Sequence, residues 1–268
     1  MTRVPQPGKT KTRLLPVLSE EGCCRLHEAL LSDLAEQMQP LEADLIVYYL
    51  DETTENLAGE LTPKMQRGRG TGEEAEKGRA DEISLLRKKE KTVSSGLLRM
   101  QEFFPHAAAF LAQPDGSLGM KMAQAFEAVF AAGYERAVLT GSDIPELSAE
   151  IIGEALSALS GADAVLNPTK DGGYYLIGFR ASCIEQETFK FLFEVSQFST
   201  KDVFRQTLEN LKAAGYAVKI GAGMQDIDTP EDLAEMQEAY ETEPDRHFRH
   251  TAAFLRAAGK AKKNEKRD

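Results

Sequence analysis

Two apolar segments of this chain each run into a loop that carries an aspartate. Residues 137–140 precede a Gly-Ser-Asp loop that ends at Asp143, and residues 164–166 precede Asp171, which two glycines follow. Ligands of open α/β sheets bind beside the carboxyl ends of the strands, where loop residues carry the function. Hard divalent cations prefer carboxylate ligands, so these loops suit a cation and the diphosphate that it binds.

The start of the chain carries a second group of charges. Residues 1–19 contain four basic residues and no acid. Between Pro7 and Arg13, a glycine, two hydroxyls and three cations suit a polyphosphate. The segment is not a Walker A loop, because Arg3 stands where that pattern requires glycine. A solvated basic surface is the competing interpretation.

Turn chemistry offers a simpler interpretation of each acidic loop. Asp143 could cap a helix, Asp171 could belong to a tight turn between strands, and Asp228 could precede a helix. The three loops follow three strands of one expected sheet, so their joint occurrence favours a shared site.

Alternating helical and strand patterns make up most of the remaining sequence. Ser19 and Ser148 stand at N-cap positions, and Thr229 before Pro230 marks another helix start. We expect strands at 44–50, 137–140, 164–166 and 216–220, and helices after Ser19, at 119–133, after Ser148, at 201–214 and after Thr229. This order predicts an α/β fold with a mostly parallel sheet and helices on both faces.

Composition agrees with a cytoplasmic enzyme built around one large domain. The net charge of −11 disfavours a nucleic-acid partner. No apolar run reaches the roughly 20 residues that span a bilayer. We expect one domain over residues 1–240, with a charged mobile insertion at about 64–95, where apolar residues are scarce. Residues 241–268 are expected to form a helical or disordered basic tail.

Five motifs resemble the DUF2064 family, whose members are often described as arsenosugar-biosynthesis-type glycosyltransferases of the GT-A fold. The motifs are PGKTKTRL at 7–14, GSDIP at 141–145, DGGYYLIG at 171–178, FST at 198–200 and DIDTPEDL at 226–233. The resemblance covers about residues 2–236, apart from the insertion, and implies a GT-A-like, Rossmann-like α/β fold. Similarity to 2-phospholactate and molybdenum-cofactor guanylyltransferases is more distant.

The resemblance also implies roles for individual side chains. Asp143 matches the acid expected to hold Mg²⁺ or Mn²⁺, and Asp228 matches the acid that often completes such a metal site. Asp171 matches the loop beside the acceptor, where a carboxylate would orient or deprotonate a hydroxyl group. The residues expected to contact the substrate are Lys9, Lys11, Arg13, Lys121, Ser142, Gly172 and Gly173.

Two features depart from the family pattern. Ser117 and Lys121 stand where the family usually has an acid and an arginine, and lysine lacks the bidentate geometry of arginine. Of the apolar strand that precedes the basic loop in the family, only residues 1–4 are present. We therefore expect a truncated first strand, with an apolar segment of about 5–6 residues encoded before Met1.

The resemblance implies a metal-dependent glycosyltransferase that moves a sugar from a nucleoside diphosphate sugar to a small-molecule acceptor. The same charges fit a nucleotidyltransferase, in which a nucleoside triphosphate is attacked and pyrophosphate leaves. A third interpretation is a non-catalytic protein that binds nucleotide. Neither a nucleic-acid partner nor a membrane span is expected.

Overall fold

The computed structural model of the chain describes residues 1–51, 94–184, 189–194, 202–242 and 248–265. Residues 64–93 of the expected insertion and the motif at 198–200 lie outside these ranges. Everything below concerns the described residues.

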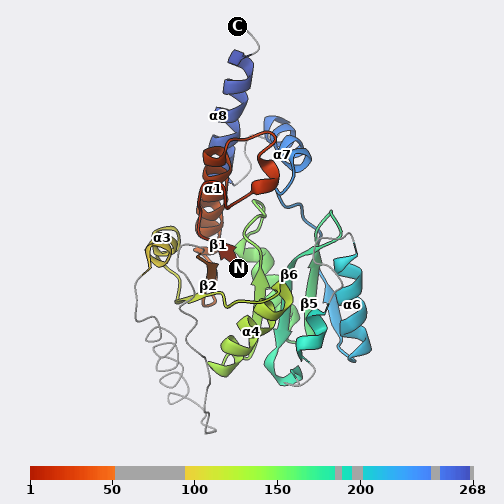
Figure 1. Cartoon of the computed structure of the whole chain (residues 1–268). Helices are drawn as coiled ribbons and strands as arrows, with labels where there is room; N and C mark the ends of the chain where they lie inside the picture. Colours follow the sequence, from red (N-terminus) through yellow and green to blue (C-terminus); the bar gives the residue numbers. More distant parts are fainter. Residues whose placement is uncertain (52–93, 185–188, 195–201, 243–247, 266–268) are drawn as a thin grey trace.

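The described strands form two sheets (Figure 1). The first sheet is parallel and contains, in spatial order, β1 (Thr2–Arg3), β2 (Ile46–Leu50) and β3 (Ala109–Ala112). The second contains, in spatial order, β4 (Arg136–Thr140), β6 (Tyr174–Arg180), β5 (Ala164–Pro168) and β7 (Val218–Ile220). β5 and β7 are parallel, whereas β6 is antiparallel to both β4 and β5. The expected α/β class is confirmed, with β6 as the strand of opposite direction.

Helices cover both faces of the second sheet. The α-helices are α1 (Glu20–Met38), α3 (Ser95–Phe103), α4 (Leu118–Ala131), α5 (Ala149–Ala158), α6 (Val203–Ala213), α7 (Pro230–Thr242) and α8 (Arg249–Glu265). Short 3₁₀ helices are η1 (Thr12–Leu14), η2 (Ala181–Cys183) and η3 (Phe189–Phe193). Leu166 of β5 packs in one buried cluster with Phe126 of α4, and its neighbour Val165 packs in another with Ile152 of α5. Successive side chains of a strand point to opposite faces, so the expected two-sided covering is confirmed.

The helix starts follow the capping residues of the sequence. The Ser19 and Ser148 hydroxyls accept hydrogen bonds from the backbone N–H groups of Gly22 (3.1 Å) and Ile151 (3.4 Å). At α7, the Thr229 N–H donates to the Asp232 carboxylate at 2.7 Å, while the Asp232 N–H donates to the Thr229 hydroxyl at 3.2 Å. These bonds satisfy N–H groups that have no partner inside the helix.

The segment expected to be a helical or disordered tail contains α8, which lies beside α1 (Figure 1). Leu255 and Ala252 of α8 share a buried cluster with Leu26 and Leu30 of α1. The Asp33 carboxylate accepts hydrogen bonds of 2.7 Å from the N–H groups of His250 and Thr251. Helix α8 is therefore joined to α1 both by apolar packing and by a capping carboxylate.

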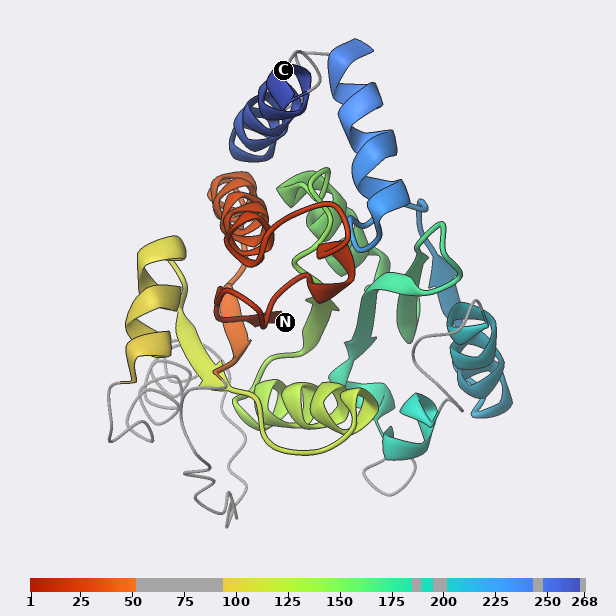
Figure 2. The same cartoon turned by 45° about the horizontal axis from the view of Figure 1, so that its top comes forward.

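The first strand is short, and the chain start lies beside β2 (Figure 2). The Met1 ammonium donates a hydrogen bond of 2.6 Å to the Thr140 carbonyl of β4, which links the two sheets. Burial lowers the pKa of this ammonium to about 6, although the negative charge of Asp143 opposes the shift.

We expect Phe179→Ala to lower the free energy of unfolding by about 3–5 kcal/mol, the range for truncating a buried Phe. The Phe179 ring is fully buried, with its centroid 5.0 Å from that of Phe126 and 5.1 Å from that of Phe189. Phe191→Ala is the matched control, because Phe191 is 58% exposed and its loss should cost less than about 0.5 kcal/mol. Urea unfolding measures both, and equal losses would contradict the placement of this aromatic core.

Candidate functional site

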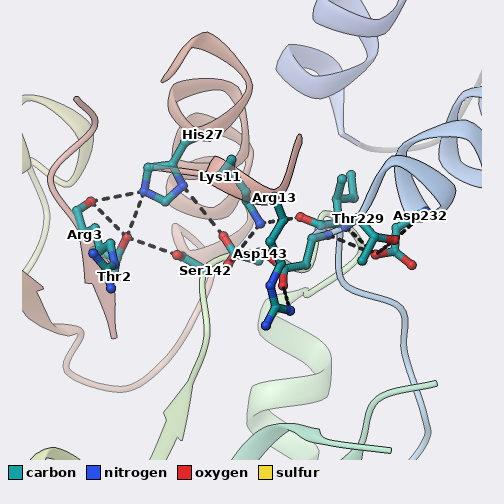
Figure 3. Close-up of polar contacts among 11 residues, drawn as sticks. Thr2, Arg3, Lys11, Arg13, His27, Ser142, Asp143, Thr229 and Asp232 are labelled. Carbon is teal, nitrogen blue, oxygen red and sulfur yellow. Dashed lines mark hydrogen bonds and ion pairs between the residues drawn. The ribbon is translucent and has the colours of Figure 1, made fainter. Parts of the chain in front are cut away.

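Three loops from different strands converge on the side chain of Lys11 (Figure 3). Lys11 follows β1, and its Nζ lies 3.0 Å from Oδ2 of Asp143, which follows β4. The same ammonium donates a hydrogen bond to the carbonyl of Ile227, which follows β7. The Ile227 N–H in turn donates to the Asp143 carbonyl at 3.0 Å. Lys11 therefore ties the basic loop to both acidic loops.

The basic loop is folded so that Lys11 points inward. Gly8 has a φ of 72° and Lys11 a φ of 52°, both in the left-handed region. A left-handed non-glycine residue costs roughly 1–2 kcal/mol. Only 3% of the Lys11 side chain is exposed, and its charge meets the Asp143 carboxylate. We attribute the unusual backbone to this pairing, which offsets the conformational cost.

His27 of α1 approaches Asp143 from the other side. Its Nδ1 lies 3.7 Å from Asp143 Oδ1, and its Nε2 lies 3.1 Å from the carbonyl of Arg3. A carbonyl only accepts hydrogen bonds, so Nε2 must carry a hydrogen to bond there. A hydrogen on Nδ1 as well would make the ring a second cation facing Asp143.

The Asp143 carboxylate is held in its ionised form. Burial alone would raise the pKa of Asp143, but the positive charge of Lys11 and the nearby His27 ring outweigh it. The net result is a pKa well below the usual range for aspartate. The Asp143 side chain is 40% exposed, although its Oδ1 atom is buried and its Oδ2 atom faces Lys11.

Ser142 was expected to contact the substrate, but its hydroxyl is used inside the protein. The side chain is buried, and Oγ donates a 3.0 Å hydrogen bond to the Thr2 hydroxyl. Thr2 Oγ1 also lies 3.4 Å from His27 Nε2. Ser142 therefore fixes the Asp143 loop to β1.

Arg13 and Asp228 form an ion pair on the open side of the site. Arg13 NH1 lies 2.7 Å from Asp228 Oδ2, with 58% of the arginine and 35% of the aspartate side chain exposed. Such exposed pairs contribute only about 0–1 kcal/mol, so a phosphate can take the arginine at little cost. Lys9 is also exposed in this loop. Asp228, expected to hold a metal with Asp143, thus has a different cationic partner.

Asp226 is the acid of this region that sequence reasoning did not select. Burial and the nearby Asp171 carboxylate raise its pKa to about 6, against the opposing charge of Lys11. The available sequence signal was that Asp226 belongs to the same DIDTPEDL motif as Asp228, on the other side of the apolar Ile227. Only Asp228 was chosen, since its position matched the family pattern.

Asp171 lies in an exposed turn between β5 and β6. Its Oδ1 accepts hydrogen bonds from the Thr169 hydroxyl (2.5 Å) and the Gly173 N–H (3.0 Å). Gly172 has a φ of 94°, which favours glycine. The tight-turn interpretation of this loop is confirmed, and the turn holds the Asp171 carboxylate in a fixed place near Asp226.

Lys121 lies in the first turn of α4, four residues after the capping Ser117. Its side chain is half-buried, and among the described residues no ion pair involves its ammonium. The structure therefore gives Lys121 no contact with the Asp143 cluster.

A different trio comes closest to a metal-like arrangement within the described ranges. Single ligand atoms of Asp33, Glu36 and His250 lie within 4.8 Å of one another. Asp33 caps α8, however, and Arg249 lies 2.5 Å from Glu36, so these charges already join α8 to α1. The acids predicted to bind metal, Asp143 and Asp228, pair with separate cations instead.

Two comparisons show what this chain is similar to. Residues 88–200 match the family model described as "Uncharacterized protein conserved in bacteria (DUF2064)", which confirms the expected resemblance. A crystal structure of a "putative nucleotide-diphospho-sugar transferase" from Desulfovibrio desulfuricans G20 is 29% identical, with a TM-score of 0.68, and the match covers 95% of this chain and 91% of that one. This neighbour confirms the GT-A-like fold.

A second solved structure, from Mycobacterium sp. strain JC1, is a homolog of a Mycobacterium tuberculosis protein. It is 16% identical with a TM-score of 0.41, over 90% of this chain and 96% of that one. The comparison with curated proteins gave no match. Within the described ranges, every helix is too short or too polar to cross a bilayer.

The Lys11–Asp143 pair predicts unequal costs for removing its two members. Asp143→Asn leaves a buried ammonium without its counter-charge, so we expect a loss of about 3 kcal/mol in unfolding free energy. Lys11→Met leaves a carboxylate that water can reach, and we expect a loss nearer 1 kcal/mol. Urea unfolding of both variants and of the double variant tests this. If Lys11→Met loses more unfolding free energy than Asp143→Asn, the unpaired aspartate is the more costly charge, and water reaches the lysine better than the aspartate.

Proposed function

We propose that this chain is a transferase that takes a nucleoside diphosphate sugar and moves the sugar to a small-molecule acceptor. One observation carries the proposal: a buried and an exposed cation each pair with a carboxylate at the carboxyl ends of β1, β4 and β7. Diphosphate groups and the cation they bind need these two charges side by side. The similar fold of a protein described as a nucleotide-diphospho-sugar transferase supports the same reading.

Asp143 and Asp226 are the residues we propose for holding Mg²⁺ or Mn²⁺. Asp143 is ionised and partly exposed, and its buried Oδ1 has no hydrogen-bond partner among the described atoms. Burial and the nearby Asp171 carboxylate raise the pKa of Asp226, and a bound cation would offset both effects. A bound divalent cation supplies Lewis-acid stabilisation to the departing diphosphate. Carboxylate oxygens are the ligands that such a hard cation prefers.

The remaining side chains take roles that follow from their exposure. Arg13 and Lys9 would bind phosphate oxygens, with Arg13 leaving Asp228 to do so. Lys11 balances the charge of Asp143 and orders the three loops. Asp171 would accept a hydrogen bond from the acceptor hydroxyl and take up its proton, because the turn fixes the carboxylate through Oδ1.

The reaction class is tested by the phosphate product. The chain is incubated with Mn²⁺ and nucleoside diphosphate sugars, with water or simple alcohols as acceptors, and the products are followed by ³¹P NMR. Release of nucleoside diphosphate supports the transferase. Pyrophosphate released from nucleoside triphosphates would instead support a nucleotidyltransferase, and tight binding without any product would support a binding protein.

Neighbouring acids of one motif allow a matched test of the metal site. We expect Mn²⁺ to strengthen binding of a nucleoside diphosphate to the parent chain and to Asp228→Asn, but not to Asp226→Asn. The amide keeps the shape of the side chain and removes the charge that a hard cation favours. Calorimetric titration with and without Mn²⁺ gives the comparison. If Mn²⁺ strengthens nucleoside diphosphate binding to Asp226→Asn but not to Asp228→Asn, Asp228 is the metal ligand instead.

The raised pKa of Asp226 predicts a pH dependence for Mn²⁺ binding. Asp226 is ionised above its pKa of about 6 and neutral below it, whereas Asp143 stays ionised across this range. Affinity for Mn²⁺ alone should therefore be constant above about pH 7 and fall as the pH drops through 6, by up to tenfold per pH unit for one proton released. Electron paramagnetic resonance of Mn²⁺ without nucleotide measures this. An identical pH profile in Asp226→Asn would assign the titration to another group.

A further inference from the structure

Tyr175 interrupts the regular pairing of β6 with β5. Leu176 pairs with Asn167, and Tyr174 pairs with the next residue of β5. Tyr175 is therefore an extra residue of β6 at this point. Such a β-bulge bends its strand and turns a side chain in a new direction, often next to a functional site. The bulge lies at the carboxyl end of β5, on the side of the sheet that carries the candidate site.

The Tyr175 hydroxyl joins the end of β5 to the segment that follows β7. It accepts a 3.0 Å hydrogen bond from Nδ2 of Asn167 and donates one of 3.1 Å to the carbonyl of Ala222. Tyr175 is buried, and burial raises the pKa of its hydroxyl, so the hydroxyl keeps the hydrogen that it donates. Asn167 lies so close to Gly221 that a Cβ at Gly221 would meet its side chain. A buried polar network thus holds this segment against β5 and β6.

The main chain of Tyr175 reaches the loop that carries Asp143. The Tyr175 carbonyl accepts a 3.1 Å hydrogen bond from the N–H of Gly141, two residues before Asp143. The Tyr175 ring shares a buried cluster with Ile144, the residue after Asp143. Tyr175 is therefore joined to the Asp143 loop by a hydrogen bond on one side of the aspartate and by the apolar core on the other.

The segment that the Tyr175 hydroxyl holds leads into Asp226. Beyond Ala222, the N–H of Met224 donates to the Pro168 carbonyl at 3.1 Å, so the segment continues along the end of β5. Asp226 follows two residues later. One residue of β6 thus contacts both segments that carry the aspartates proposed to hold the cation.

We propose that Tyr175 is a positioning residue for the cation site, which fixes the Asp226 segment through its hydroxyl and the Asp143 loop through its carbonyl. This role rests on the proposed function, which places the cation between these two aspartates. Groups that bind a metal must be held within about 0.5 Å of their productive positions. Without the hydroxyl, the Ala222 carbonyl loses its donor and Nδ2 of Asn167 loses its acceptor, so the Asp226 segment is held less firmly.

Two neighbouring tyrosines of one motif give a matched test. Tyr174 packs on the opposite face of β6, where its hydroxyl donates to Sδ of Met122. We expect Tyr175→Phe to weaken Mn²⁺ binding about tenfold, the lower end of the range for residues that support a metal ligand, and Tyr174→Phe to leave it unchanged. Electron paramagnetic resonance of Mn²⁺ without nucleotide measures both. Hydrogen exchange at the amides of residues 221–228 should become faster in Tyr175→Phe alone.

A double variant separates this role from stability. Asn167→Leu combined with Tyr175→Phe replaces both polar partners by apolar groups, which removes the unpaired Nδ2 that the single variant leaves. The Ala222 carbonyl still lacks its donor. We therefore expect the double variant to regain part of the thermal midpoint that Tyr175→Phe loses, while its Mn²⁺ binding stays about tenfold weaker than that of the parent chain.

Three results would overturn the proposal. The first is an unchanged Mn²⁺ affinity in Tyr175→Phe, and the second is an equal loss of affinity in Tyr174→Phe. The third is a double variant whose Mn²⁺ affinity recovers together with its thermal midpoint, because the hydroxyl would then act only through stability. These results reject the role of Tyr175 and leave the cation site in place. A parent chain that binds no Mn²⁺ would instead reject the cation site, and the role of Tyr175 would fail with it.

Discussion

The ammonium of Lys11 between Asp143 and Ile227 is the interaction on which the candidate site depends. A buried ammonium requires a counter-charge, and Asp143 supplies it from the end of β4. The carbonyl of Ile227 fixes the same ammonium to the segment that carries Asp226 and Asp228. One side chain thus sets the relative position of three loops that the sequence separates by more than 200 residues.

This interaction also sets how the site can respond to a ligand. Oδ2 of Asp143 already meets Lys11, and Oδ1 is buried beside His27, so a cation would have to share Oδ2 or displace one of these neighbours. Outside this buried pair, Arg13 and Asp228 are exposed and can separate at small cost. The site therefore combines a fixed inner pair with an outer pair that can exchange partners.

The sequence was sufficient for the elements whose signals are local. Apolar runs located β2, β4 and β5, and Ser19, Ser148 and Thr229 located three helix starts, because caps and strand patterns depend on near neighbours. A tight turn at Asp171 was considered, but the position of β6 between β4 and β5 was not predicted, since this pairing is a long-range choice. Lys11 and Asp143 were both predicted to be site residues, but the ion pair between them was not predicted.

The roles of other site residues also depend on contacts between residues that are far apart in the chain, so only the structure reveals them. Ser142 follows a strand like a ligand-binding residue, but its hydroxyl meets Thr2, which is 140 residues away in the chain. His27 occupies an inward position of α1, where a histidine is usually a packed core residue. Asp226 differs from Asp228 only through burial and the charges around it, and neither is visible in a sequence motif.

The central claim is that Asp143 and Asp226 hold the cation that binds a nucleoside diphosphate. Crystals grown with Mn²⁺ and a nucleoside diphosphate, measured at the manganese edge, test it most directly. The account predicts an anomalous peak at about 2.0–2.3 Å from a carboxylate oxygen of each residue, with the diphosphate beside Arg13. A peak beside Asp33, Glu36 and His250, or bound nucleotide with Lys11 as the sole cation at Asp143, would contradict it.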